Sequence, residues 1–405
     1  MNAEARLREC LARIEAREGE VRAFVHLDVE GALAQARALD AGPVRGPLHG
    51  LPLGVKDIFD THDMPTAMGS PLYAGHRPRA DAAAVALCRA AGAVVVGKTV
   101  TTEFANMTAG ITRNPLNPAH TPGGSSSGSA AAVADGMLPL ALGTQTAGSI
   151  IRPAAYCGVV GIKPSFGRVP RAGVKANAES MDTVGGFGRT VAEAALLASV
   201  LTGDARLREW TVPDSLRIGL VPGPDWAHAD ADVAACWAQA VRALAPRAAR
   251  CEDAVLPPGF ADVAEVQAAI QAAETAQALA FEHRRHRAAL SDALLALLDR
   301  GRAVDAETLA AHRARAERWR REVDALFERH DVLLTPSTGG EAPEGLRFTG
   351  DPLFCRPWSL LGLPCVHLPF ARGTRGLPVG LQLVGRHGED HRLLAAAQWC
   401  MDRLG

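Results

Sequence analysis

Lysine is scarce in this sequence. Of its 43 basic residues only four are lysines, and the remaining 39 are arginines. The four lysines are Lys56, Lys98, Lys163 and Lys175. Arginine keeps its proton in proteins, whereas a lysine that is removed from water can lose it. The few lysines are therefore candidates for positions at which an arginine would fail.

Other features are missing as well, and each absence excludes a class of protein. No apolar run approaches the roughly 20 residues that span a bilayer, so we expect no membrane partner. Acidic and basic residues balance, at 44 against 43, which removes any general electrostatic argument for binding nucleic acid. The eight cysteines include no Cys-x-x-Cys pair. This pattern favours reduced thiols in a cytoplasmic protein over a disulfide framework or a zinc site.

The spacing of apolar residues predicts alternating helices and strands. Leu7, Leu11 and Ile14 lie at helical spacing among charged residues, which indicates an amphipathic surface helix rather than a signal peptide. We then expect a strand that ends near Lys56, a helix over 81–92, a strand in AVVVGKT, a helix from the serine cluster near 127, and strands over 138–144, 157–164 and 216–221. Strands return in DVLLTP, GLPCVHLPF and LPVGLQLVG, and a helix closes the chain.

These elements indicate an α/β fold with a single large domain, residues 1–405, in which helices cover both faces of one mixed, twisted β-sheet. Its catalytic core is expected in 50–190, and strands and a helix in 331–405 complete it. Residues 204–330, rich in alanine, arginine and glutamate, are expected to form a helical excursion over one side. The histidines of HRRH, residues 283–286, belong to this charged stretch and suit a solvated helix face better than a metal site.

The stretch TPGGSSSGS, residues 121–129, has the composition of a flexible linker. It lies inside a dense α/β region, however, so one of its serines could be a nucleophile. Ser126 is the centre of a G-x-S-x-G motif. A nucleophile elbow requires a strand directly before its serine, and the preceding NPLNPAHTP contains three prolines and cannot be a central strand. Ser126 is therefore a poor candidate.

A different constellation combines three separated residues, Lys56, Ser125 and Ser149. Ser149 lies in TAGSIIRPAA, at a turn that leads into a short helix, where backbone N–H groups can form an oxyanion hole. A lysine buried at the end of a sheet can be neutral, because desolvation lowers its pKa. It could then draw a proton through one hydroxyl from another and so activate a serine.

Five separated blocks of the sequence closely resemble the amidase signature family: LPLGVKDIFD, GAVVVGKTVTTEFA, NPAHTPGGSSSGSAAAVADG, ALGTQTAGSIIRPAAYCGVVGIKPSFGRVP and GLPVGLQLVGR. They occur in the family's order and spacing, over 50–190 and 331–395. The resemblance implies a Ser–cis-Ser–Lys catalytic set that uses no histidine, metal or cofactor. Carried over by motif position, the nucleophile is Ser149, the base is Lys56, and the bridging serine is Ser125, which follows a cis peptide bond.

The family mechanism implies that neutral Lys56 takes a proton from Ser125, which takes one from Ser149 as it attacks an amide carbonyl. The oxyanion would be held by the backbone N–H groups of Thr146, Ala147, Gly148 and Ser149. One departure concerns this hole, because the family often has D-x-G-G-S where this chain has Q-T-A-G-S. If the backbone at Ala147 needed a positive φ, its Cβ would cost about a kcal/mol, so we expect an altered oxyanion hole.

Arg152 follows Ser149 by about one helical turn. It could be structural, paired with an acidic neighbour, or its guanidinium could bind a substrate carboxylate in a bidentate manner. The sequence QTxGSxIRPAAYCG resembles the malonamidase-like subgroup, which hydrolyses small amides that carry a carboxylate. We therefore expect Arg152 to bind a malonamate-like substrate, and we leave a homodimer open as the assembly.

Two other functions stay in view. Glutaminase subunits of tRNA-dependent amidotransferases are relatives, but their nucleophile motif usually carries an acidic residue where this chain has Gln145, and they need partner subunits. A family member whose site has decayed through Ala147 could act as a binding protein, although all three catalytic side chains are present. The partner that we expect is a small-molecule amide, with no nucleic acid.

Overall fold

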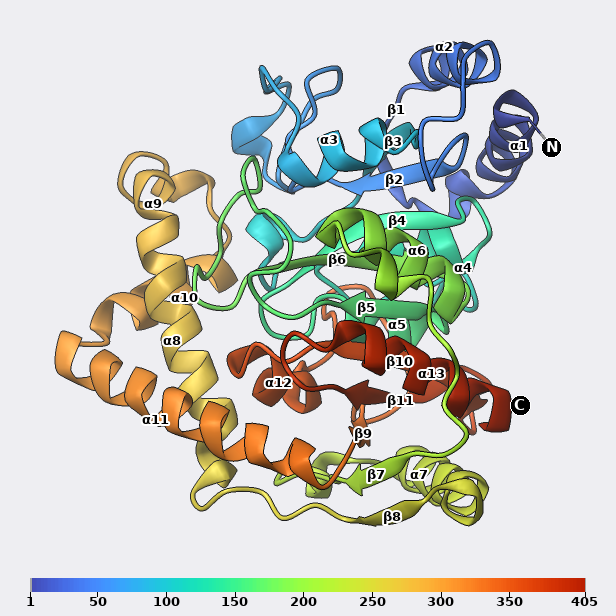
Figure 1. Cartoon of the computed structure of the whole chain (residues 1–405). Helices are drawn as coiled ribbons and strands as arrows, with labels where there is room; N and C mark the ends of the chain where they lie inside the picture. Colours follow the sequence, from blue (N-terminus) through green and yellow to red (C-terminus); the bar gives the residue numbers. More distant parts are fainter. Residues whose placement is uncertain (1, 405) are drawn as a thin grey trace.

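An eleven-stranded β-sheet forms the centre of the molecule (Figure 1). The computed structural model describes residues 2–404. The strands are β1 (Phe24–Leu27), β2 (Pro52–Lys56), β3 (Val94–Thr99), β4 (Leu140–Gln145), β5 (Val160–Lys163), β6 (Thr183–Gly188), β7 (Arg217–Leu220), β8 (Arg250–Asp253), β9 (Val332–Pro336), β10 (Cys365–Arg372) and β11 (Pro378–Val384). Their order across the sheet is β1-β3-β2-β4-β6-β5-β10-β11-β9-β7-β8.

The sheet is mixed, as the sequence predicted. β2 pairs in parallel with β3 and β4, and β7 pairs in parallel with β8 and β9. From β4 to β9 across the sheet, neighbouring strands are antiparallel. Because β2 and β4 are parallel, their carboxyl ends meet at the same edge of the sheet, and this edge carries Lys56 and Gln145.

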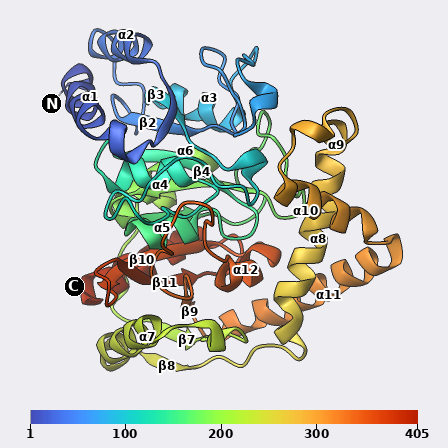
Figure 2. The same cartoon turned by 180° about the vertical axis from the view of Figure 1, so that it is seen from behind.

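Helices cover both faces of the sheet, which confirms the predicted fold class (Figures 1 and 2). One face carries α1 (Ala3–Val21), α2 (Val29–Asp40), α4 (Ser127–Ala134) and α5 (Ile151–Cys157), and the other carries α3 (Ala83–Ala90), α6 (Val191–Thr202), α7 (Ala231–Leu244) and α13 (Asp390–Leu404). Side chains alternate along each strand, so Val94 and Val96 pack beneath α1 and α2, whereas Val95 packs beneath α3.

A group of helices lies beside the ends of the strands rather than on a face, as both views show (Figures 1 and 2). It consists of α8 (Val263–Ala278), α9 (Ala280–Arg285), α10 (Asp292–Ala303) and α11 (Ala306–Asp324), with α12 (Arg356–Leu360) next to the sheet. The predicted helical excursion over 204–330 is therefore helical mainly in its later part. Its first part supplies α7 and the strands β7 and β8, and β8 has the polar sequence RCED, which gives no strand signal.

The helix at the start of the chain forms as expected, with Leu7 and Ile14 buried along one side. The stretch 157–164 differs from the prediction of a strand, because α5 extends through Cys157 and the strand begins only at Val160. Gly158 separates them, since its φ of 69° ends the helix in the left-handed conformation that glycine favours. Within residues 2–404, no helix combines the length and apolar character that a membrane crossing requires.

Candidate active site

Lys56 is the last residue of β2 and is completely buried. Its Nζ donates a hydrogen bond to Ser125 Oγ at 2.8 Å and another to Thr144 Oγ1 at 2.7 Å. Lys98 is equally buried, but its Nζ lies 3.0 Å from Asp57 Oδ1 and so remains in an ion pair. The partners therefore distinguish the two lysines, and only Lys56 is hydrogen-bonded to a serine.

The surroundings of Lys56 favour its neutral form. Burial is the largest cause and lowers the pKa of Lys56 to about 7. The charge of Asp182 raises this pKa, and the charge of Arg152 lowers it further. An amine with a pKa near neutrality is unprotonated in a large fraction of molecules at pH 7, and it can then accept a proton from a hydroxyl.

Ser125 lies two residues before the first residue of α4, and the peptide bond that joins it to Gly124 is cis. The two serines that follow are bound to backbone carbonyls. Ser126 Oγ donates to a carbonyl of β4 at 3.3 Å, and Ser127 Oγ donates to the carbonyl four residues before it at 2.8 Å. These bonds suit Ser126 and Ser127 to supporting the backbone.

Ser149 lies between β4 and α5, in a turn of residues 146–150 that we name the Ser149 turn. Its side chain is nearly buried, with 8% of the residue exposed. Within residues 2–404, none of the backbone N–H groups of residues 146–149 donates a hydrogen bond. Free amides on consecutive residues beside a serine are suited to bind an oxyanion. Ala147 has no positive φ, so the strain considered for its Cβ is absent.

Arg152 is buried in α5, and its guanidinium is occupied by backbone carbonyls. Nε and Nη2 donate to the carbonyl oxygen of Gly124 at 3.2 and 2.6 Å, and Nη1 donates to that of Gly350 at 2.6 Å. This arrangement favours a structural role, with carbonyls in place of an acidic neighbour. Binding of a substrate carboxylate by Arg152 stays a prediction. The same bonds tie α5, which follows Ser149, to the residue before Ser125.

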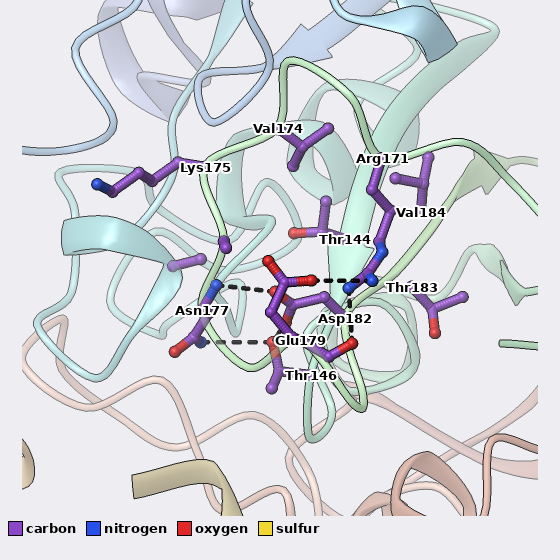
Figure 3. A pocket seen from close by; sticks show the side chains of 12 residues that line it. Thr144, Thr146, Arg171, Val174, Lys175, Asn177, Glu179, Asp182, Thr183 and Val184 are labelled. Atoms are coloured by element: carbon purple, nitrogen blue, oxygen red, sulfur yellow. Dashed lines mark hydrogen bonds and ion pairs between the residues drawn. The ribbon is translucent and has the colours of Figure 1, made fainter. Parts of the chain in front are cut away.

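A small pocket opens next to Thr144 and Thr146 (Figure 3). Its wall includes Thr144, which binds Lys56, and Thr146 of the Ser149 turn; the other lining residues are Ala105, Arg171, Val174, Lys175, Ala176, Asn177, Glu179, Asp182, Thr183 and Val184. Thr146 Oγ1 donates to Asp182 Oδ1 at 2.6 Å. Burial raises the pKa of Asp182, and the hydrogen bonds that it accepts oppose this rise.

Among the described residues, the histidines of HRRH belong to no group of three or more metal-ligating side chains. His283 of HRRH lies 3.4 Å from Asp299, on an arginine-rich helical surface. The structure also gathers one group that the sequence did not suggest, in which ligand atoms of His62, Asp63 and Asp81 lie within 4.8 Å of one another. Arg89 lies 2.6 Å from Asp63 and 3.1 Å from Asp81, so these carboxylates already have a cationic partner.

Sequence reasoning missed two residues near Lys56. Thr144 could have been found from strand pairing, because the parallel register of β2 and β4 sets Val55 opposite Leu142 and so brings Thr144 close to Lys56. Asp182 has no such signal, since it lies far along the chain in the loop before β6. Its position depends on how that loop folds over the pocket.

The geometry supports cleavage of an acyl bond by serine chemistry. A buried lysine of lowered pKa binds one serine, and a second serine lies in a turn whose amides are free. The fold is a mixed sheet covered by helices, and the site sets a buried lysine against a serine at the edge of that sheet.

The family profile described as Amidase matches residues 5–394. The chain therefore belongs to the amidase family, and it is an amide-hydrolysing enzyme. In sequence it is 38% identical over 442 residues to a glutamyl-tRNA(Gln) amidotransferase subunit of Roseiflexus castenholzii, and the match covers 95% of this chain and 89% of that protein.

Solved structures agree with this assignment. A crystal structure described as an amidase is similar with a TM-score of 0.89 at 35% identity, over 100% of this chain and 97% of that one. The peptide amidase from Stenotrophomonas maltophilia is similar with a TM-score of 0.84 at 30% identity, over 100% and 94% of the two chains. These relatives do not single out the malonamidase-like subgroup. The name of the Roseiflexus relative includes a tRNA, which conflicts with the expectation that no nucleic acid is involved.

Proposed function

We propose that the protein hydrolyses a carboxamide through an acyl-enzyme on Ser149, with Lys56 as the base and Ser125 as the proton bridge. The hydrogen bond from Lys56 Nζ to Ser125 Oγ carries this proposal. It is made by a completely buried amine whose pKa lies at about 7. A lysine with an ordinary pKa of roughly 10.4 would be protonated at pH 7 and could not accept the serine proton.

The proposed steps conserve protons and electrons. Lys56 Nζ accepts the proton of Ser125 while Ser125 Oγ accepts that of Ser149, and Ser149 Oγ bonds to the amide carbon. The carbonyl electron pair moves to the oxygen, which the amides of residues 146–149 stabilise. When the C–N bond breaks, Ser125 protonates the leaving amine and recovers its own proton from Lys56. Water then attacks the ester by the same relay and releases the acid.

For the substrate, we propose a small primary carboxamide that releases ammonia, with glutamine as the first candidate. The relatives named as glutamyl-tRNA(Gln) amidotransferase subunits support this glutaminase role better than the malonamate-like one. Arg152, the expected ligand of a malonamate carboxylate, already donates to two backbone carbonyls. The malonamate-like substrate therefore rests on the local sequence QTxGSxIRPAAYCG alone.

The proposed glutaminase role implies partner molecules, namely further protein subunits and a tRNA. One subunit of an amidotransferase works with further protein subunits, and the names of the relatives point to a glutamyl-tRNA as the acceptor. We further propose that the protein works in the cytoplasm, a reducing compartment, which is supported by its eight free cysteines. A homodimer stays a prediction.

Ammonia release by the purified protein tests the proposal. The substrates are glutamine, malonamate and the neutral butyramide, and a fluorophosphonate probe reports the reactive serine by mass spectrometry. We expect turnover of at least one primary amide, labelling at Ser149, and loss of both in Ser149→Ala. Hydrolysis that persists in Ser149→Ala would rule out the acyl-enzyme.

The same assay separates the substrate classes. Preference for glutamine, together with two further subunits that co-purify with the protein from its native cell, would support the glutaminase role. Preference for malonamate over butyramide would restore the malonamate-like substrate. The matched control for Ser149→Ala is Ser199→Ala, because Ser199 is also buried but donates to a carbonyl within α6.

A further inference from the structure

The Ser149 turn is held from both ends by the side chain of Gln145. Gln145 is the last residue of β4 and is completely buried. Its Oε1 accepts hydrogen bonds from the backbone N–H groups of Ile150 at 2.8 Å and Ile151 at 3.0 Å. Its Nε2 donates to Ser359 Oγ at 3.0 Å, and Ser359 belongs to α12, far along the chain. Gln145 thus joins its own turn to a distant helix.

Ser359 completes this connection by donating from Oγ to the carbonyl oxygen of Ala147 at 2.6 Å. In a trans peptide the C=O and the next N–H point in opposite directions. Fixing the Ala147 carbonyl toward α12 therefore turns the N–H of Gly148 away from α12. Gln145 occupies the amides that follow Ser149, so the amides that remain free are those of residues 146–149.

We propose that Gln145 and Ser359, which we name the brace, are positioning residues that fix the oxyanion-binding amides of the Ser149 turn. Glutamine suits this place because it both accepts and donates. Its donated bond occupies a lone pair of Ser359 Oγ and leaves the hydroxyl proton for Ala147. An ionised acid at position 145 would accept only, and the Ser359 proton would then turn toward the carboxylate instead.

The segment before α12 also packs directly on the turn. A Cβ added to Gly148 would lie 2.9 Å from Pro352 Cβ and 3.2 Å from Cys355 Cβ. The turn and this segment therefore meet without room for a side chain at position 148, and Pro352 and Cys355 limit any movement of Gly148 toward α12. The contact with the segment before α12 and the hydrogen bonds of the brace both restrict the peptide between Ala147 and Gly148.

The brace is anchored in turn by the helices beside the sheet. Arg320 of α11 donates from Nη2 and Nε to the carbonyl oxygens of Leu360 and Leu361, at 3.0 and 3.1 Å. Arg356 of α12 donates from Nη1 to Gln267 Oε1 of α8 at 2.5 Å. The helices of the later part of 204–330 thus hold α12 in place, and through Ser359 they hold the turn that carries Ser149.

The test compares Ser359→Ala with Ser199→Ala, which removes a buried hydroxyl of the same kind from α6. In Ser359→Ala we expect kcat to fall by about ten- to a hundredfold, because a misplaced reacting group costs rate rather than affinity. KM should stay within about threefold of the wild type for the same reason. Labelling of Ser149 by the fluorophosphonate should slow in proportion, since its phosphoryl oxygen uses the same amides. Ser199→Ala should keep both rates.

A second pair of variants keeps the test decisive if Ser359→Ala does not fold. Arg320→Gln removes the bonds from α11 to α12, and Arg318→Gln changes an exposed arginine on the same helix. We expect kcat to fall in Arg320→Gln alone, by about two- to tenfold. Unchanged kcat in both Ser359→Ala and Arg320→Gln would overturn the inference.

The inference rests on the proposed role of Ser149, and the outcomes separate the two. An active wild type, an inactive Ser149→Ala and an unaffected brace variant would leave the proposed function standing and remove the brace. Amide hydrolysis that survives Ser149→Ala would remove both. A parallel loss of kcat and of thermal stability in Ser359→Ala and Ser199→Ala would show that the hydroxyl serves folding only.

Discussion

At the scale of the residue, three of the four lysines are buried. Lys56, Lys98 and Lys163 are completely buried, and burial lowers the pKa of each of them. An arginine in such a place would keep its charge. Lys98 has a carboxylate partner, whereas the partners of Lys56 are hydroxyls. The hydrogen-bond partners, rather than burial alone, support the proposal that Lys56 is the base.

Replacing Lys56 by arginine should abolish most of the activity. Arginine retains a positive charge of similar reach but cannot accept the proton of Ser125. We expect Lys56→Arg to lower kcat by more than about a hundredfold, with a far-ultraviolet circular dichroism spectrum like that of the wild type. A variant that keeps more than about a tenth of the turnover, a loss of only about 1.4 kcal/mol, would show that Lys56 is not the base.

The activity should depend on pH through the same group. Because burial lowers the pKa of Lys56 to about 7, kcat/KM should rise as the pH increases through about 7 and then level off. The charge of Asp182 raises this pKa, so Asp182→Asn should move the midpoint to lower pH. Initial rates between pH 5 and about 9 measure both midpoints. An upward shift in Asp182→Asn would contradict the electrostatic assignment.

Arg152 provides the residue-scale test of the substrate. Arg152→Ala removes the bonds to the carbonyl of Gly124, the residue before Ser125. Charge-assisted bonds contribute on the order of 1.5–3 kcal/mol, so we expect kcat/KM to fall about ten- to a hundredfold. The fall should be equal for malonamate and for butyramide if the role is structural. A loss confined to malonamate would show that Arg152 binds the carboxylate.

At the scale of the element, the packing of α10 on α8 depends on one glycine. A Cβ on Gly301 would lie 1.9 Å from the carbonyl oxygen of Ala272, so an alanine there forces the two helices apart. Gly19, in α1, has no atom within 4 Å of the same position. The two glycines therefore form a matched pair in which only one has a packing role.

Urea unfolding of the two alanine variants measures this difference. Gly301→Ala should lower the free energy of unfolding by about 1–3 kcal/mol, the usual cost of overpacking. Gly19→Ala should raise it by up to about 1 kcal/mol, because alanine is the better helix former. Equal changes in the two variants would mean that α8 and α10 adapt to the added methyl group.

The elements that sequence reasoning identified share a clear apolar period. The strands that end at Lys56 and that lie in AVVVGKT and LPVGLQLVG form where they were expected. They were predictable because a buried strand is rich in branched apolar residues. β6 was missed since its sequence TVGGFG is half glycine, and glycine reads as a turn. Its place between β4 and β5 comes from strand pairing, which a local pattern does not reveal.

At the scale of the whole molecule, only those site residues that belong to a sequence motif could be predicted. Motif position placed Lys56 and Ser125 together, and the structure brings them into hydrogen-bond contact. Ser359 could not be found in this way, because its role depends on α12 reaching the Ser149 turn from another part of the chain. The catalytic roles of the three residues stay predictions.

The whole molecule should also work without a bound metal. Among the described residues, the group with suitable ligand spacing is His62, Asp63 and Asp81, and Arg89 already pairs with both carboxylates. We expect exhaustive dialysis against EDTA to leave amide hydrolysis unchanged. Activity that is lost on dialysis and restored by zinc would contradict the serine mechanism.

The brace has a consequence for how this gene can recombine with those of its relatives. Gln145 and Ser359 are encoded far apart, so a crossover anywhere between them inherits one half of the pair from each parent. A chimera that takes its first half from a relative with an acid at position 145 would keep both serines and the lysine. Its acid could not donate a hydrogen bond to Ser359, which comes from the other parent, so the brace would be lost. Viable crossovers should therefore avoid this interval, or else exchange both positions together.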